Sequence, residues 1–345
     1  MTDPGPADQG LTYPGAADYG VTGPGPARQV DLLVVGDCNP DVLVLGDDVT
    51  PQFGQQEKIV ASMSLVIGGS AAITAVAAAR LGLRVALVAA VGDDPAGQLA
   101  RSQVAAEGVD VAAVSVRPCA PTGMTVALSE GADRAILTAT GAITTLTATD
   151  VPDALLARSR HLHVSSYFLL ERSLGPGLAA LFAGARAAGV TTSLDTNWDP
   201  AGQWGDDRLR AALAQTDLLL PNEAEALRLS GQATLAAAVP VLTAAGSRLV
   251  VKLGARGALC VDGERQCQVG LPVVRRPIDT TGAGDCFNAG LIAGLLRGLD
   301  LARATALGCA VGAASTQAAG GTASCPDLPA ALALALTATI RQASA

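Results

Sequence analysis

Strand-length apolar runs alternate with helix-length segments that end at glycine, and this rhythm constrains the fold more than any other feature of the sequence. The first apolar run, "VDLLVV", starts at Val30. Further along, a helical segment has Ser70 placed to cap its start and Gly82 placed to end it, and the buried run "RVALVAAVG" follows. Buried strands joined by helices form mostly parallel sheets with helices on both faces. The sequence therefore predicts an α/β fold.

Three regions depart from this rhythm. Residues 41–61 and 114–138 read as pairs of extended segments with polar turns, and we expect them to form a small β-layer from which a lid is built. Residues 1–29 repeat "PGPA" or "PGAA" every ten residues, and a composition this rich in Gly and Pro cannot bury a core. We therefore predict a flexible tail over residues 1–29 and one domain over residues 30–340.

Charge, cysteine and histidine content narrow the functional classes. The net charge is −8 and no basic run is present, which argues against a nucleic-acid partner. Seven cysteines without a C-x-x-C pair fit neither a zinc site nor a disulfide framework and predict reduced thiols in the cytoplasm. The only histidines, His161 and His163, exclude a multi-histidine metal site and are interpreted as a strand end. We find no secretory or membrane-spanning pattern, so we expect no membrane partner.

The stretch "DTTGAGDCFNAG" carries the strongest chemical signal. Gly282, Ala283 and Gly284 follow a predicted strand, "VVRRPI", and allow a sharp turn that presents backbone N–H groups to an anion at a helix start. We expect that helix to run from near Asp285 to Arg297. Asp285 is placed to accept the proton of an attacking hydroxyl while those N–H groups stabilise a transferring phosphoryl group. Spacing alone leaves a second interpretation open, in which Asp285 only caps the helix.

Two separated stretches resemble the signatures of one family. "DTTGAGDCFNAGLIAGLL" resembles the C-terminal signature of the ribokinase-like (PfkB) carbohydrate kinases, and "GGSAAITAVAAARLGLRVALVAAVGDD" resembles their N-terminal signature. The resemblance implies a ribokinase-like fold of three layers with a mostly parallel central sheet and a small β-lid. It also implies that the chain is a phosphotransferase that uses ATP and Mg²⁺. The γ-phosphoryl group of ATP would be transferred to a hydroxyl of a sugar, sugar acid or cyclitol.

The resemblance assigns roles to individual residues. Asp285 matches the catalytic base, and the backbone of Gly282, Ala283 and Gly284 matches the anion hole. The substrate-binding positions are Asn39, Asp41, Gly68, Gly69 and Ile73. The nucleotide-binding positions are Asn222, Glu225, Lys252, Gly254 and Gly257. The metal positions are Glu225 for magnesium, and Asp279 and Thr281 for a monovalent cation such as K⁺. Lid strands of the family often pair between subunits, which implies a homodimer.

Several of these residues also have structural interpretations that the sequence leaves open. Asn39 and Asp41 can form an Asx turn after the first strand. Asn222 and Glu225 have the spacing of a capping box, which is compatible with a site role. Lys252 can simply end a strand.

One position departs from the family pattern. Ile73 stands where many sugar kinases have an asparagine that binds substrate hydroxyls, and an aliphatic side chain cannot make that hydrogen bond. This places ribose and fructose 6-phosphate in doubt as acceptors. It keeps open a nucleoside kinase whose acceptor pocket is lined by Ile73, Phe53 and Met63, and a non-catalytic ligand sensor. Trp198 stands where some sugar-acid kinases have a basic residue and is interpreted as a packing residue.

Overall fold

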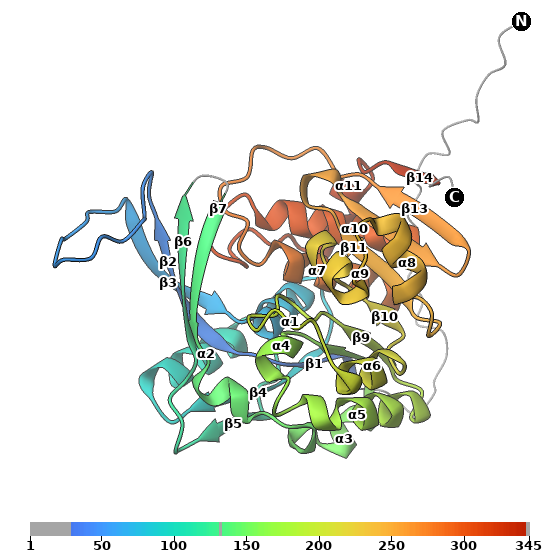
Figure 1. Ribbon diagram of the computed structural model, residues 1–345, viewed down its shortest axis with the longest axis horizontal. Coiled ribbons are helices and arrows are strands. Elements are labelled where there is room, and N and C mark those ends of the chain that lie inside the picture. Colours follow the sequence, from blue (N-terminus) through green and yellow to red (C-terminus); the bar gives the residue numbers. More distant parts are fainter. Residues whose placement is uncertain (1–28, 131–132, 343–345) are drawn as a thin grey trace, which may run out of the picture.

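The computed structural model describes residues 29–130 and 133–342, which form a large sheet with helices on both faces and a smaller sheet that projects from it (Figure 1). The predicted tail lies outside the described residues except for Gln29. The strands of the large sheet are, in spatial order, β14 (Ile340–Gln342), β13 (Arg265–Val269), β12 (Ala258–Asp262), β11 (Arg248–Lys252), β10 (Leu218–Leu219), β9 (Thr191–Leu194), β8 (Ser159–Val164), β1 (Val30–Val35), β4 (Val85–Gly92) and β5 (Val114–Arg117).

Strands from β5 to β11 are paired in parallel, whereas β11 to β14 are antiparallel. The prediction of a mostly parallel α/β sheet is therefore confirmed. Because parallel neighbours all point the same way, the carboxyl ends of β1, β8, β9, β10 and β11 meet at one edge of the sheet. This edge is where ligands bind in open α/β sheets.

Each face of the large sheet has its own hydrophobic core. Leu32 and Val34 of β1 belong to one core and Leu33 and Val35 to the other, as strand alternation requires. The first face is covered by α1 (Ser70–Arg80), α2 (Pro95–Ala106), α9 (Ala283–Leu296), α10 (Leu301–Ser315) and α11 (Leu328–Ala335). The second face is covered by α3 (Asp153–Ala157), α4 (Tyr167–Leu170), α5 (Gly175–Ala187), α6 (Asp207–Leu213), α7 (Glu223–Ser230) and α8 (Leu235–Leu242). Three short 3₁₀ turns are η1 (Gly141–Thr145), η2 (Ala148–Asp150) and η3 (Gly254–Arg256).

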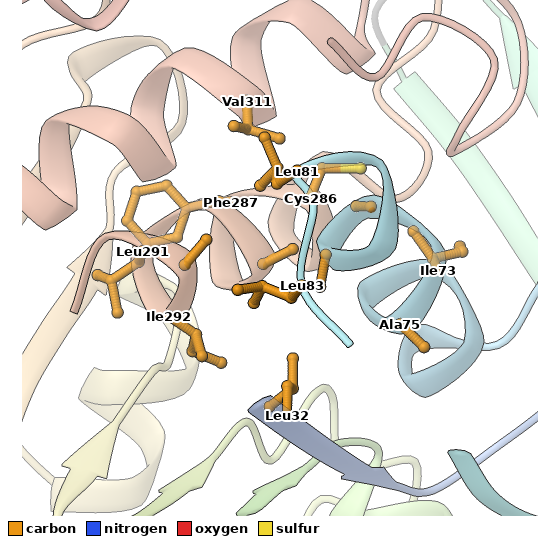
Figure 2. Packing of buried hydrophobic residues seen from close by; sticks show 14 of the residues in the cluster. Leu32, Ile73, Ala75, Leu81, Leu83, Cys286, Phe287, Leu291, Ile292 and Val311 are labelled. Carbon is orange, nitrogen blue, oxygen red and sulfur yellow. The ribbon is translucent and has the colours of Figure 1, made fainter. Parts of the chain in front are cut away.

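Helices α1, α9 and α10 pack together in the first core (Figure 2). Small residues along α9 allow this close approach: a Cβ added at Gly290 would lie 2.8 Å from the Leu307 carbonyl oxygen, and one added at Gly294 would lie 2.9 Å from the Ala304 Cα atom. These contacts hold α9 against α10, and the Thr74 hydroxyl of α1 donates to the Asp285 carbonyl oxygen at 3.3 Å, which ties α1 to the start of α9. Within the described residues, no helix is both long and apolar enough to cross a membrane.

The smaller sheet contains four strands in the order β3 (Ser62–Gly68), β2 (Asn39–Leu45), β6 (Met124–Glu130) and β7 (Asp133–Ala139). Its boundaries differ from the expected lid segments. Residues 114–117 form β5, which pairs with β4 in the large sheet because Val114 is buried in the first core. Residues 46–61 form the polar connection between β2 and β3. The second strand of this pair, β3, therefore lies just after the segment 41–61 that was expected to contain both strands.

Three local predictions were wrong. Residues 271–277 have no regular structure, so "VVRRPI" is not a strand. Helix α9 begins at Ala283 with Gly282 as its N-cap, so Asp285 is the third helical residue and does not cap the helix. Ser70 is the first residue of α1, and its own backbone N–H donates to the Asp37 carboxylate at 3.1 Å. A carboxylate distant in the sequence therefore caps α1. The end of α1 at Gly82, whose φ is +80°, is as predicted.

Candidate active site

Polar residues from five segments lie near the carboxyl edge of the large sheet. Asp37 follows β1, Asp195 follows β9, and Lys252 ends β11. The N-termini of α1 and α9 point at the same region, since Asp37 binds the first amides of α1 and the Ser70 hydroxyl lies within hydrogen-bonding reach of Asp285. The first N–H groups of each helix lack partners within that helix and favour negative charge. The edge therefore combines two helix starts with several ionisable side chains.

The turn into α9 is shaped by glycine. Gly282 has φ of +69°, and a Cβ added there would lie 2.8 Å from the Gly321 Cα atom, so no larger residue fits. A Cβ added at Gly284 would lie 3.6 Å from the Lys252 ammonium nitrogen. The structure thus places Lys252 against the start of α9, where Gly282 is the N-cap and Ala283 and Gly284 are the first helical residues. Such a turn is a suitable anion site.

Asp285 is 8% exposed, and both negatively and positively charged side chains influence its pKa. Burial raises its pKa well above the usual range, and the nearby carboxylate of Asp195 raises it further. The ammonium of Lys252 and the hydroxyl of Ser70 act in the opposite direction. The result is a buried carboxyl group with raised proton affinity beside a cation that acts in the opposite direction.

Lys252 forms a buried ion pair with Asp195. The side chain of Asn288, on α9, donates to the same carboxylate oxygen of Asp195 at 2.6 Å. Burial lowers the pKa of Lys252, but the carboxylates of Asp195 and Glu225 outweigh burial and raise the pKa overall. Lys252 thus ends a strand and also places a positive charge in the site.

Asn222 and Glu225 form the predicted capping box at the start of α7. The Asn222 side chain accepts from the Glu225 N–H at 2.9 Å, and the Glu225 carboxylate accepts from the Asn222 N–H at 2.8 Å. Burial, together with Asp195, raises the pKa of Glu225 to about 7. The capping box therefore holds the buried Glu225 carboxylate in the same cluster of charged side chains as Lys252 and Asp195.

The donor set can be compared with the needs of magnesium. In the described part of the chain, no three His, Cys, Asp or Glu side chains meet to hold a metal ion. Mg²⁺ usually needs only one or two carboxylates, because phosphates and water complete its shell. Glu225, buried beside an anion site, fits that requirement.

Asn39 and Asp41 lie on β2, at the base of the small sheet, so the alternative of an Asx turn is wrong. The Asn39 side-chain amide donates to the Asp41 carboxylate at 2.7 Å. Burial, aided by the charge of Asp37, raises the pKa of Asp41 to about 7. Gly68 leaves room for this carboxylate, since a Cβ there would lie 1.9 Å from it. Gly69, with φ of +86°, leaves room for the Asp37 backbone, because a Cβ there would lie 2.7 Å from the carbonyl oxygen.

Ile73 is 3% exposed and lies on α1 in the first core (Figure 2). A Cβ added at Gly282 would lie 3.1 Å from its Cγ2 atom, and one added at Gly321 would lie 2.9 Å from its Cδ1 atom. Ile73 therefore forms the apolar support of the turn into α9. Phe53 and Met63, the other residues of the proposed apolar pocket, are mostly exposed.

Asp279 joins the loop that precedes α9 to the connection between α10 and α11. Its carboxylate accepts from the N–H and the hydroxyl of Thr281 at 2.9 and 2.8 Å, and from the Gly320 N–H at 2.8 Å. Both oxygens of Asp279 are thus engaged within the protein. Gly254 and Gly257 have positive φ values and shape η3, the turn between β11 and β12 next to Lys252.

Sequence reasoning missed four residues that complete the site: Asp37, Asp195, Asn197 and Asn288. Asn197 accepts from the Ser166 N–H and donates to the Ser70 hydroxyl, each at 2.9 Å. Asp37 and Asn197 each follow a buried strand of the parallel sheet, and this position was the available signal. Asn288 carried no such signal, because its partner is distant in the sequence.

The histidines and Trp198 have structural roles. His161 and His163 lie within β8 and bond through their ring nitrogens to Ser and Thr hydroxyls at 2.7–2.8 Å, and burial lowers their pKa values to about 3 and about 4. They belong to the sheet interior rather than to a strand end. Trp198 packs edge-to-face on Trp204, with ring centroids 4.8 Å apart, as a packing residue would.

Known proteins resemble this chain over most of its length. The model of the pfkB family carbohydrate kinases matches residues 30–328. A ribokinase of Haemophilus influenzae is 30% identical over 86% of this chain and 95% of its own. A 2-dehydro-3-deoxygluconokinase of Bacillus subtilis is 30% identical over 76% of this chain and 84% of its own. The structure of a putative ribokinase II from E. coli in complex with ATP and Mg²⁺ superposes with a TM-score of 0.78, at 25% identity over 88% of this chain and 98% of that one.

The family match and the curated relatives agree with the three-layer fold and with the charged edge of the sheet. The chain therefore belongs to the pfkB family of carbohydrate kinases and is a phosphotransferase that acts on a sugar hydroxyl.

Proposed function

We propose that this kinase transfers the γ-phosphoryl group of ATP to a hydroxyl of a sugar or sugar acid at the carboxyl edge of the large sheet. One observation carries the proposal: the Lys252 ammonium lies against Gly284 at the N-terminus of α9, and its charge acts on the Asp285 carboxyl group in the same first turn. A base, a cation and a set of amide donors are what phosphoryl transfer requires, because its catalysis depends on positioning and on charge stabilisation.

Asp285 is the proposed general base. Its carboxylate accepts the proton of the attacking hydroxyl, and the raised proton affinity of the buried group favours this transfer. The amides of Gly282, Ala283 and Gly284, together with Lys252, hold the phosphate oxygens and stabilise the charge that develops on them. Magnesium, when bound, neutralises phosphate charge, and Glu225 is the residue that would hold it.

Asn39 and Asp41 are the proposed acceptor contacts. A carboxylate and an amide at hydrogen-bonding distance can bind neighbouring hydroxyls of a polyol. Both are buried at the base of the smaller sheet of β3, β2, β6 and β7, which we call the lid sheet. The relatives named ribokinase and 2-dehydro-3-deoxygluconokinase support a sugar or sugar acid. Because Ile73 offers no polar group, we infer an acceptor with fewer hydroxyl contacts on the side of α1.

The lid sheet also supports a proposal about assembly. Apolar side chains are exposed on it, namely Met63, Leu65, Ile136 and Leu137. These residues lie on β3 and β7, the two outer strands of the sheet, and exposed strand edges are sites where another chain can pair. We propose that two copies pair through these strands. Closure of this sheet over the acceptor would exclude water and limit ATP hydrolysis.

Two further proposals concern ions and location. The loops that Asp279 joins, near Thr281 and Gly320, would offer backbone carbonyl groups to a monovalent cation such as K⁺. All seven cysteines are free thiols, which supports a cytoplasmic location.

A mass-spectrometric screen tests the acceptor class. Purified protein with ATP and Mg²⁺ is offered sugars, sugar acids, cyclitols and nucleosides, and a mass increase of one phosphoryl group identifies the product. We expect product from a sugar or sugar acid. Phosphorylation of nucleosides alone would overturn the proposed class, and ATP and polyol binding without any product would favour a ligand sensor.

A further inference from the structure

Two cysteines from different segments meet directly beneath the proposed reaction centre. The Sγ atoms of Cys286 and Cys325 lie 3.0 Å apart. Cys286 is the residue after Asp285 in α9, and it is buried among apolar side chains of α1, α9 and α10 (Figure 2). Cys325 lies in the connection between α10 and α11 and is half-buried. Thirty-nine residues of chain separate them, so the tertiary fold alone makes this pair.

The surroundings give the two thiols different characters. The guanidinium of Arg80 hydrogen-bonds the Thr322 carbonyl and forms an ion pair with Glu107 at 2.7 Å. A hydrogen bond from the Cys286 thiol and the charge of Arg80 lower the pKa of Cys325, whereas the interaction with Cys325 and burial raise the pKa of Cys286. Cys325 is thus both the more acidic and the more accessible thiol. A thiolate near a cation is the reactive form of cysteine.

We propose that Cys286 and Cys325 form a reversible disulfide when the protein meets a hydroperoxide, and that this bond slows phosphoryl transfer. The second part rests on the function proposed above.

The chemistry needs only the peroxide as oxidant. The Cys325 thiolate attacks one peroxide oxygen, the O–O bond breaks, and the leaving oxygen takes up a proton as water or an alcohol. The sulfur of Cys286 then attacks the sulfenic acid formed on Cys325, the S–O bond breaks, and hydroxide leaves with the Cys286 proton as water. The two thiols together lose two electrons, and the peroxide gains them.

The position of the pair explains an effect on catalysis. A disulfide S–S bond is about 2.0 Å long, so the two sulfurs must approach by about 1 Å from their 3.0 Å separation. That movement acts on the residue next to Asp285. It also acts on the loop of Gly321, whose carbonyl oxygen lies 3.1 Å from the Cys286 sulfur and whose Cα atom packs against Gly282. A misplacement of about 1 Å in a catalytic site can reduce the rate on the order of a hundredfold.

The test treats the full chain with hydrogen peroxide and measures three quantities: turnover, the Cys286–Cys325 peptide link under non-reducing conditions, and recovery with dithiothreitol. We expect the link to form, kcat to fall at least about tenfold, and the reductant to restore both. Turnover of the untreated, reduced protein is measured first and separately decides the proposed function.

Variants separate this pair from the other thiols. Cys325→Ser should keep the turnover of the reduced protein and lose the response to peroxide. Cys267→Ser is the matched control, because Cys267 and Cys260 are cross-strand partners on β13 and β12, and it should keep the response. Absence of the link in treated protein, or a link that leaves kcat unchanged, would overturn the proposal.

Discussion

Asp285 and Asp41 are both buried carboxyl groups with raised pKa values, yet their surroundings differ. Asp285 lies in the first turn of a helix, and the ammonium of Lys252 counteracts part of its burial. Asp41 lies on a strand of the lid sheet, where the Asn39 amide and the Thr125 hydroxyl are its hydrogen-bonding partners. A carboxylate near a cation and a helix start is suited to taking a proton. A carboxylate among amide and hydroxyl groups is suited to binding substrate hydroxyls. We therefore expect Asp285 to act as the base and Asp41 to bind the acceptor.

The sharpest test of this division replaces each acid by its amide. Asp285→Asn should leave affinity for ATP and acceptor within a few-fold and lower kcat by roughly 10²–10⁴, the scale of a positioned general base. Asp41→Asn should instead act mainly through the KM for the acceptor. Steady-state kinetics on both variants provides the measurement. Near-normal kcat in Asp285→Asn would remove the base assignment.

The cation that distinguishes the two acids can be removed next. Lys252→Met takes away a positive charge that lowers the pKa of Asp285, so that pKa should rise further. Because the base must be ionised, the acidic limb of the kcat profile should move to higher pH, and kcat at pH 7 should fall by about 10–100-fold. Arg256→Met, which removes an exposed cation paired with Glu223, is the matched control and should leave the profile in place. An unmoved acidic limb in Lys252→Met would show that the cation does not tune the base.

Loss of Lys252 also leaves Asp195 as an uncompensated buried charge, which costs about 3–5 kcal/mol of stability. The double variant Lys252→Met with Asp195→Leu removes both charges and should recover much of that loss. Urea unfolding of the single and double variants measures it.

The ionised side chain of Asp41, on the lid sheet, is expected to destabilise the folded protein. Asp41 titrates at about 7 in the folded protein, whereas an unfolded Asp titrates at about 3.9, so ionisation disfavours the folded state. Below about pH 4 both states are protonated and the group costs nothing; the cost grows between these values and is complete above pH 7. Asp41→Asn should therefore unfold like the wild type at pH 4 and be more stable by up to about 4 kcal/mol at pH 8. Equal stability of Asp41→Asn and the wild type at both pH values would contradict the burial of the Asp41 charge.

The smallest effect is expected at the outer strands of the lid. Leu137→Lys places a charge on an exposed apolar strand, and it should convert the proposed dimer to a monomer while changing kcat by only a few-fold. Val273→Lys is the control, since Val273 is an exposed apolar residue outside the lid. Light scattering gives the mass of each variant, and a wild-type monomer would refute the proposed assembly.

The phosphate-binding side of the site was predicted from the sequence more fully than the side formed by the lid sheet and the start of α1. The turn of Gly282, Ala283 and Gly284 into α9 was predicted, as was the capping box of Asn222 and Glu225, because both depend on residues that are adjacent or three apart. The lid was predicted as a β-layer with wrong boundaries, since strand pairing depends on which distant segments meet. The cap of α1 was assigned to Ser70 because the sequence offers no sign that Asp37 lies there.

Local sequence patterns were enough to predict the alternation of strands and helices, the glycine turn, the capping box and, through two separated motifs, the family. These features are local, because backbone conformation and short-range hydrogen bonds are set by neighbouring residues. The three-dimensional structure was needed to show that Asp195 pairs with Lys252, that Asn288 donates to the same carboxylate, and that Cys286 contacts Cys325. Burial and charge pairing depend on which strand ends and helix starts the fold brings together, and no local pattern encodes that arrangement.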